Sequence, residues 1–195
     1  MRVPLSARVG LPTVLLAWSL PVAAVLAEPP PATKPAAPTV VAPALSAAEC
    51  AVWERERSFA ATVAAHDAVA FAEHVHAQAA FDAGSAQPIH GRAAVVAAWK
   101  DIIAGTSIKL RWSPGVVTLG GDGSLAISRG PAWIEDSRPG ATSRHRVGEF
   151  ISTWIRDRDG QWRVLFDGGA APMRPATAAD VAKLIASIPA QCPRG

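Results

Sequence analysis

Residues 148–169, GEFISTWIRDRDGQWRVLFDGG, decide the fold class of this chain. On each side of Asp159-Gly160 the residue types alternate with a period of two, which is typical of strands with two different faces. An Asp-Gly pair between two such runs is a strong signal for a tight hairpin turn. The segment therefore predicts an antiparallel β-hairpin.

The chain before this hairpin carries further strand patterns. Strands are expected at residues 108–112, 116–119 and 125–134, separated by Pro114-Gly115 and by the turn GGDG at 120–123. A proline followed by a glycine breaks or bulges a strand, and a glycine-rich turn lets the chain reverse. Together with the hairpin, these runs predict an antiparallel meander.

Helical patterns flank the strands. Ser46 and Glu49 have the spacing of a capping box, which satisfies free backbone amides at a helix start. Helices are expected at residues 46–65, after Asp67, at 92–103 and at 177–188, with a short extended segment at 79–82. Three helices before a meander indicate an α+β fold, in which helices cover one face of a curved sheet and leave a pocket between them.

The first 27 residues have the three parts of a secretory signal peptide. Arg2 and Arg8 form a positive start, Leu11 to Leu26 is apolar, and Val25-Leu26-Ala27 places small or modest side chains at the positions that a signal peptidase reads. The alternative is an uncleaved membrane anchor, but the apolar run is shorter than the roughly 20 residues that span a bilayer. We expect cleavage after Ala27, no stable membrane anchor afterwards, and a periplasmic or secreted protein.

Four regions follow from these patterns. They are the signal peptide at 1–27, a Pro-rich linker at 28–45, one domain at 46–172, and a C-terminal helix and tail at 173–195. The net charge is +3, but losing Arg2 and Arg8 would leave 17 basic and 16 acidic residues. No basic stripe remains to neutralise phosphates, so nucleic-acid binding is not expected.

Cys50 and Cys192 are the two cysteines of the chain. In an oxidising compartment an even pair is expected to form a disulfide, which here would join the two ends of the folded region. The alternative is two unrelated thiols.

The order of elements and several motifs resemble the nuclear transport factor 2-like superfamily, and most of all its exported, ketosteroid-isomerase-like (SnoaL-like) proteins of unknown function. The resemblance spans about residues 48–170. It rests on His66-Asp67, Gly91-Arg92-Ala93-Ala94-Val95, Trp99, Trp112-Ser113-Pro114, Gly130-Pro131-Ala132-Trp133, Gly148-Glu149-Phe150, Thr153-Trp154, Asp159-Gly160-Gln161-Trp162-Arg163-Val164 and Asp167-Gly168-Gly169.

The resemblance implies a cone-shaped half-barrel of curved antiparallel sheet packed on three N-terminal helices, with the C-terminal helix as an addition. Its open end can hold a small hydrophobic ligand, and such proteins are often homodimers. Some relatives are isomerases, cyclases or dehydratases, and many only bind or assist, so the fold does not decide the function. No cofactor is implied.

The residues that steroid isomerisation needs are not matched. The chain has no tyrosine, and Phe59 stands where the resemblance places a tyrosine that donates to an oxyanion. The base position falls near Ala83. Asp82, one residue away, is expected on the opposite strand face, and the second donor position falls near Ser152. Isomerase chemistry of that kind is therefore not expected.

Glu149 and Asp82 are the weak candidates for acid–base catalysis. Glu149 shares a predicted strand face with Val147 and Ile151, where an unpartnered carboxyl would have a raised pKa. The favoured alternative is an ion pair of Glu149 with Arg129 or Arg144. No residue spacing supports a metal site, because His74 and His76 would diverge on a helix.

Phe59, Trp112, Trp133 and Ser152 are the predicted pocket residues. The first hypothesis is an exported module that binds a small hydrophobic molecule without defined catalysis. The second is an isomerase, dehydratase or cyclase that acts through Glu149 or Asp82. The third is a structural dimer whose sheet face is the interface.

Overall fold

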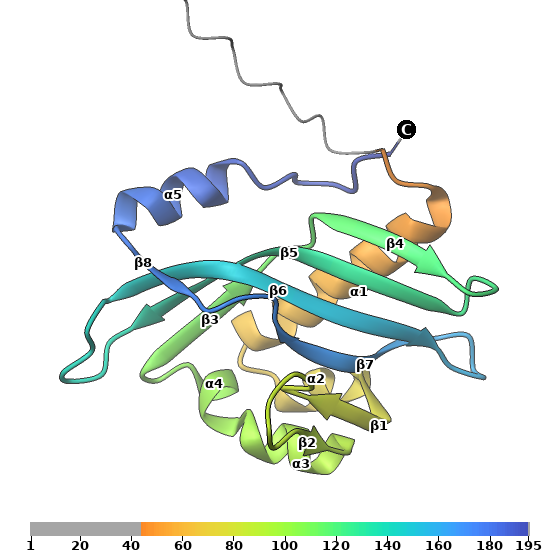
Figure 1. Cartoon of the computed structure of the whole chain (residues 1–195), viewed down its shortest axis with the longest axis horizontal. Helices are drawn as coiled ribbons and strands as arrows, with labels where there is room; N and C mark the ends of the chain where they lie inside the picture. The colour runs from red at the N-terminus through yellow and green to blue at the C-terminus, as the bar shows by residue number, and fades with distance from the viewer. Residues whose placement is uncertain (1–43, 195) are drawn as a thin grey trace, which may run out of the picture. The chain divides into compact units, whose positions relative to one another are not determined.

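The computed structural model describes residues 44–194 (Figure 1). The expected signal peptide and nearly all of the Pro-rich linker lie outside the described residues. Within residues 44–194, no helix has both the length and the apolar character that a membrane span requires.

The described residues form five helices, whereas the sequence predicted four. They are α1 (Ala47–Ala64), α2 (Ala68–His74), α3 (Arg92–Ala98), α4 (Lys100–Ala104) and α5 (Ala178–Ala186). The predicted capping box is present, since the Ser46 side chain accepts from the Glu49 amide and the Glu49 carboxylate accepts from the Ser46 amide. The single helix expected at 92–103 breaks at Trp99, whose φ of −87° and ψ of 0° end one helix and begin the next.

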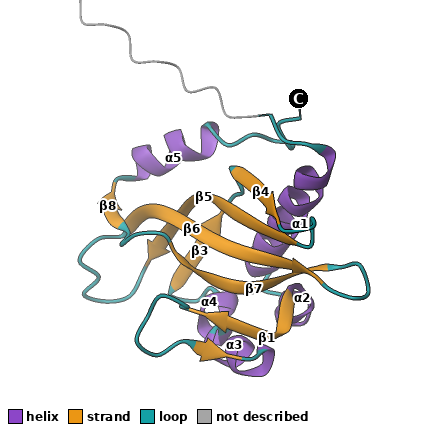
Figure 2. Cartoon of the chain, turned by 45° about the vertical axis from the view of Figure 1, so that its right-hand side comes forward, coloured by secondary structure: helices purple, strands orange, loops and turns teal. Residues whose placement is uncertain are grey.

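The strands curl into one half-barrel sheet around the helices (Figure 2). They are β1 (Val75–Phe81), β2 (Ile89–His90), β3 (Ile108–Trp112), β4 (Val116–Gly120), β5 (Leu125–Asp136), β6 (His145–Arg156), β7 (Trp162–Gly169) and β8 (Arg174–Ala176). The order is β2-β1-β7-β6-β5-β3, with β4 also on β5 and β8 on β6. The predicted α+β half-barrel with its C-terminal helix is confirmed.

One pairing departs from the expected antiparallel sheet. Strands β1 and β7 are parallel, with Phe81 opposite Asp167, so the sheet is mixed. The two strands are separated by most of the domain, and no hairpin turn sets their relative direction. The extended segment expected at 79–82 is the end of β1, which begins earlier, at Val75.

Helix α1 packs against the inner face of the sheet and contacts β3, β4 and β5. Its Trp53, Phe59 and Val63 are fully buried, and β6 turns Trp154 towards them. The Phe59 ring lies 5.3 Å from Trp112 and 6.0 Å from Trp154, measured between centroids. An aromatic core therefore fills the narrow part of the half-barrel.

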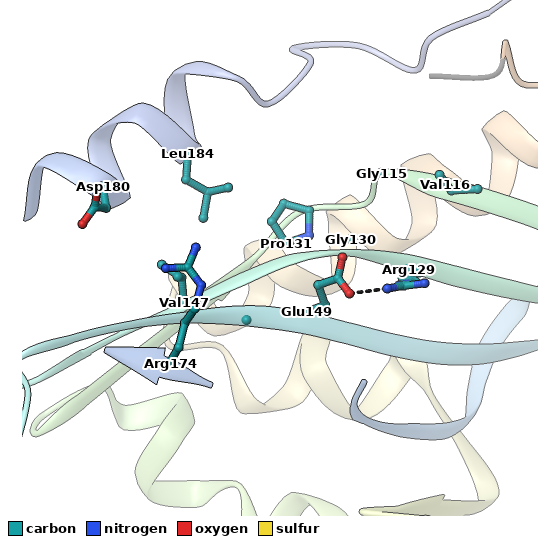
Figure 3. Close-up of a pocket in the computed structure, with 11 residues that line it drawn as sticks. Gly115, Val116, Arg129, Gly130, Pro131, Val147, Glu149, Arg174, Asp180 and Leu184 are labelled. Carbon is teal, nitrogen blue, oxygen red and sulfur yellow. Dashed lines mark hydrogen bonds and ion pairs between the residues drawn. The ribbon is translucent and has the colours of Figure 1, made fainter. Parts of the chain in front are cut away.

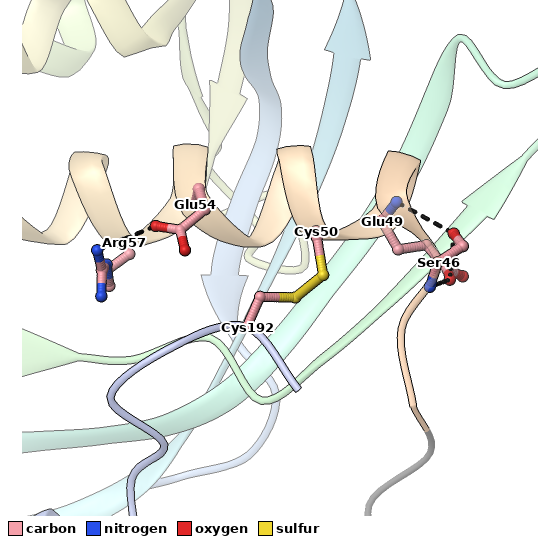
Figure 4. Close-up of a disulfide and its surroundings, with 6 residues drawn as sticks. All are labelled: Ser46, Glu49, Cys50, Glu54, Arg57 and Cys192. Carbon is pink, nitrogen blue, oxygen red and sulfur yellow. Dashed lines mark hydrogen bonds and ion pairs between the residues drawn. A yellow bond between two sulfur atoms is a disulfide. The ribbon is translucent and has the colours of Figure 1, made fainter. Parts of the chain in front are cut away.

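The predicted disulfide joins Cys50 of α1 to Cys192 in the C-terminal segment (Figure 4). Their Cα atoms are 5.7 Å apart. Beside this bond, the amide of the buried Leu45 donates to the carbonyl of Pro193 at 2.7 Å. The start and the end of the domain are thus held together by a covalent bond and a backbone hydrogen bond.

Candidate functional site

A cavity of about 250 Å³ lies within the curl of the sheet, at the end where α4 faces β3, β5, β6 and β7. It is lined by Asp82, Trp99, Ile102, Leu110, Trp112, Ala132, Ile134, Glu149, Phe150, Asp167, Gly168, Gly169 and Met173. Most of these side chains are apolar, which is typical of pockets for small organic molecules.

Three aromatic residues form one wall of the cavity. Trp112 lies between Trp99 and Phe150, with ring centroids 6.3 Å and 6.4 Å away. Trp112 ends β3, Phe150 comes from β6, and Trp99 sits at the break between α3 and α4. The break in the predicted helix therefore places an indole at the cavity.

Asp167 is the most deeply set carboxyl group of this cavity. It lies opposite Ser152 in the β6–β7 ladder, and the Ser152 hydroxyl donates to Oδ2 of Asp167 at 3.2 Å. The residue keeps some exposure through the cavity, although protein atoms surround its carboxyl group. Burial, and then the nearby charges of Glu56 and Asp82, raise the pKa of Asp167 well above its usual value, against the opposing effect of Ser152.

Asp82 stands beside Asp167 at the cavity. It follows Phe81, the partner of Asp167 in the sheet, and has a φ of 51°, in the left-handed region. A strand would turn residue 82 to the opposite face, as the sequence predicted, but the left-handed backbone ends the alternation there. The next amide, that of Ala83, donates to the carbonyl of Asp167 at 3.4 Å.

Glu56 of α1 is a buried carboxylate that the sequence analysis missed. It is fully buried and accepts hydrogen bonds from the indole N–H groups of Trp112, at 2.8 Å, and Trp154, at 2.7 Å. Burial raises the pKa of Glu56, and the two indole donors act in the opposite direction. The nearby hydroxyls of Ser128 and Ser152 also lower the pKa of Glu56, which means that they favour its charged form. Neither hydroxyl makes a hydrogen bond of normal geometry with Glu56.

A signal for Glu56 was available in the sequence. Glu56 follows Trp53 by three residues and precedes Phe59 by three, so helical spacing places it in the middle of an apolar face. Glu56 lies within the charged run Glu54–Arg57, and a run of charges near a helix start does not indicate that one of its members is buried.

The predicted pocket residues separate into different places. Trp112 lines the cavity. Phe59 lies behind Trp112 in the closed core, and Ser152 is fully buried next to Asp167. Trp133 alternates with Ala132 and Ile134, which line the cavity, so its side chain lies on the opposite face of β5.

Glu149 lies on the outer face of the sheet, in a separate groove beneath α5 (Figure 3). The groove measures about 750 Å³ and is bordered by Arg174 and by Leu184 of α5. The Glu149 carboxylate forms an ion pair with Arg129 there, as the favoured interpretation had it. The Glu149 side chain thus points away from the inner cavity. Glu149 still borders that cavity, because it belongs to β6, which forms part of the cavity wall.

Residues 44–194 contain no group of three or more His, Cys, Asp and Glu side chains arranged to hold a metal ion. His74, considered above for metal binding, is buried. Its Nδ1 lies 2.7 Å from the carbonyl oxygen of Ala70, and its Nε2 lies 3.0 Å from the hydroxyl of Ser58.

Comparisons with known proteins agree with this architecture. The family model of the SnoaL-like domain matches residues 56–165. No curated protein sequence matches the chain. A nuclear transport factor 2-like protein of unknown function from Pseudomonas putida is similar in structure, with a TM-score of 0.52 and 20% identity over 67% of this chain and 90% of that one.

Two further solved structures share the fold. A nuclear transport factor 2-like superfamily protein from Salmonella enterica has a TM-score of 0.52 and 11% identity, over 67% of this chain and 95% of that one. A ketosteroid isomerase-like protein from Erwinia carotovora has a TM-score of 0.50 and 11% identity, over 64% of this chain and 98% of that one. At such identities the likeness concerns the fold alone. By its sequence the chain belongs to the SnoaL-like domain family, and its fold is the one that these nuclear transport factor 2-like structures share.

Proposed function

We propose that this protein binds a small, mainly apolar organic molecule in the inner cavity, with the polar end of the ligand at Asp167. The observation that carries the proposal is the buried carboxyl group of Asp167, which lies beside the exposed Asp82 in a wall that is otherwise mainly apolar and aromatic. Apolar walls favour binding by removing hydrocarbon surface from water, and a few polar groups fix the orientation of the ligand.

The dimensions of the cavity limit the ligand. Its volume of about 250 Å³ is below the common range of roughly 300–1,000 Å³ for pockets that hold drug-sized molecules. A compact molecule with one ring or a short branched chain fits such a space. The raised pKa of Asp167 means that its carboxyl group can donate a hydrogen bond at a pH where most aspartates are ionised.

The same carboxyl group supports a second candidate function. A carboxyl with a raised pKa in a cavity can exchange a proton with a bound molecule, as isomerases, dehydratases and cyclases require. Asp167 has this environment. Glu149 is exposed to solvent and paired with Arg129, so an enzymatic function would rest on Asp167, with Asp82 beside it.

The test is to close the cavity and measure binding of a fragment library of small ring compounds by ligand-observed NMR. Ile134→Trp adds bulk at the cavity wall, and Val69→Trp makes a comparable change on α2, where Val69 is 76% exposed. We expect fragments to bind the wild type and Val69→Trp, and to bind Ile134→Trp at least about 10-fold more weakly. Equal binding to both variants, or no binding to the folded wild type, would overturn the proposal.

The proposed place of action is the periplasm or the cell exterior. Two features support it: the sequence of residues 1–27, and the disulfide between Cys50 and Cys192, a bond type that persists in oxidising compartments.

A further inference from the structure

The charged residues that line the inner cavity are all acidic. Asp82 and Asp167 line it, and Glu56 lies behind Asp167 in the core. Among residues 44–194, none of those that line this cavity is Lys, Arg or His. A buried anion in this cavity would meet carboxyl groups and no cation, so anionic ligands are disfavoured.

Two basic side chains from the elements around the cavity, Arg111 and Arg92, are engaged elsewhere. Arg111 follows the cavity residue Leu110 and donates to its backbone carbonyl at 2.8 Å. Arg92, at the start of α3, donates to the carbonyl of Val75 at 2.7 Å. Neither side chain supplies positive charge to the cavity wall, so a bound molecule would have to bring it.

The aromatic wall is suited to a positive charge as well. Trp99, Trp112 and Phe150 form a continuous row with centroid separations of 6.3 Å and 6.4 Å. The faces of aromatic rings attract ammonium groups, most strongly where the ring is tryptophan and water is excluded. Aromatic rings and carboxyl groups therefore occur together in one small space, and both favour a cation.

We propose that the cavity selects small organic cations, meaning compact apolar molecules that carry one ammonium group. The ammonium group would lie near Asp82 and Asp167, and the apolar body against Trp99, Trp112 and Phe150. This inference rests on the proposed function, because it names the class of ligand that the same cavity takes.

The groups that face Asp167 predict how such binding depends on pH. They are Glu56 from α1, Asp82 after β1 and Ser152 from β6. Without a ligand, burial and these carboxyl groups favour the protonated form of Asp167 and raise its pKa. A bound cation favours the ionised form, so binding releases a proton and becomes tighter as the pH rises towards that raised pKa.

The experiment compares three probes of similar size. Phenyltrimethylammonium and tert-butylbenzene have the same shape and differ in charge, and benzoate supplies the opposite charge. Binding is followed through the indole NMR signals of the wild-type protein, since Trp99 and Trp112 line the cavity. We expect phenyltrimethylammonium to bind about 10-fold more tightly than tert-butylbenzene, and benzoate to bind least.

Two conservative variants and a control locate the charge preference. Asp167→Asn and Asp82→Asn remove the carboxylates at nearly constant volume, and asparagine tolerates the left-handed backbone at position 82. Asp159→Asn is the control, because Asp159 lies in the turn of the same hairpin, paired with Arg163 outside the cavity. In the double variant Asp82→Asn, Asp167→Asn, we expect the ratio of the affinities for phenyltrimethylammonium and tert-butylbenzene to fall to about 1. In Asp159→Asn we expect this ratio to stay as it is in the wild type.

Each outcome separates this inference from the proposed function. If tert-butylbenzene binds as tightly as phenyltrimethylammonium, the cavity is a binding site but the cation inference is wrong. The same holds if the double variant keeps the preference, or if cation affinity does not rise as the pH increases above the ordinary aspartate pKa of about 3.9. If neither probe binds and the fragment library also fails, the proposed function itself is overturned.

Discussion

The indole N–H of Trp154 donates a hydrogen bond of 2.7 Å to Glu56, a residue 98 positions away in the chain. The second indole on Glu56, from Trp112, also borders the inner cavity. One carboxylate in α1 therefore connects the first helix to strands β3 and β6, and it fixes one aromatic side of the cavity.

The first prediction concerns this carboxylate. Glu56→Ala would leave two buried indole N–H groups without an acceptor and would open a void, so we expect a loss of about 3–5 kcal/mol in the free energy of unfolding. Glu56→Gln keeps the volume and one acceptor, and we expect it to cost about 1–2 kcal/mol. Urea denaturation followed by tryptophan fluorescence measures both.

The matched control is Glu54→Gln, two residues earlier in the same helix. Glu54 is 43% exposed and pairs with Arg57 at 3.1 Å, and exposed pairs of this kind contribute at most about 1 kcal/mol. If the variants of Glu56 cost no more than this control, the two indole bonds do not stabilise the fold.

Asp167 gives a pH-dependent prediction. Its pKa in the folded protein is raised above the unfolded value of about 3.9. Its contribution to stability is therefore complete below about pH 4 and is lost as the pH rises towards the folded pKa, by up to about 1.4 kcal/mol per pH unit. Asp167→Asn removes this titration, so the variant should gain stability relative to the wild type as the pH increases.

Thermal unfolding of both proteins across a pH series measures this difference. A constant difference in free energy of unfolding at every pH would mean that Asp167 titrates normally. For Asp159→Asn, the stability difference from the wild type should change with pH in the opposite direction, because Arg163 lowers the pKa of Asp159 to about 2. Wild type should gain stability over that variant as the pH rises from about 2 to 5.

The disulfide supports a third prediction. A loop as long as the one between Cys50 and Cys192, 142 positions apart, restricts the unfolded chain strongly. We expect the double variant Cys50→Ala, Cys192→Ala to lose about 2–5 kcal/mol of unfolding free energy. Reduction of the wild type with dithiothreitol should give a similar loss and should leave the double variant unchanged. A double variant as stable as the oxidised wild type would contradict the expectation.

Much of the fold could be predicted because its signals are local. The capping box at Ser46, the turn at Asp159-Gly160 and the alternation along β6 each depend on residues close together in the chain. The parallel pairing of β1 with β7 depends on residues about 86 positions apart, such as Phe81 and Asp167, and no local pattern records it.

The cavity was harder to predict for the same reason. Trp112 was predicted as a pocket residue because aromatic side chains can line a hydrophobic pocket, and it lines the cavity. Asp167 appeared in the sequence only as part of a family motif, and its role depends on Ser152 and Glu56, which tertiary packing brings close. Asp82 was expected on a strand face, but β1 ends at Phe81, and the left-handed φ of Asp82 cannot be read from alternation.

The expected homodimer remains a prediction, and the outer face of the sheet is where we place it. Five large apolar side chains on β4 to β7 are between 38% and 48% exposed: Val116, Leu125, Ile127, Ile151 and Phe166. Exposed apolar side chains gathered on neighbouring strands are typical of interfaces. Light scattering should give twice the mass of the chain, and Ile127→Asp should give a monomer. A wild-type monomer would contradict this.

Export is the last prediction. When the full chain is expressed in a Gram-negative bacterium, mass spectrometry of the periplasmic and secreted fractions should find a protein that begins at Glu28. Replacing Arg2 and Arg8 with glutamate should retain the protein in the cytoplasm. A protein that keeps residues 1–27 in these fractions would contradict cleavage after Ala27.

The bond between Cys50 and Cys192 closes residues 50–192 into a covalent ring. A protease that cuts one exposed loop, such as the one at 137–144 between β5 and β6, would therefore produce a nicked molecule instead of two separate pieces. The disulfide would keep both parts in one molecule, so that they stay close together. The cut chain could therefore refold around the same cavity. Loss of the inner cavity would then require two cuts, or one cut together with a reductant.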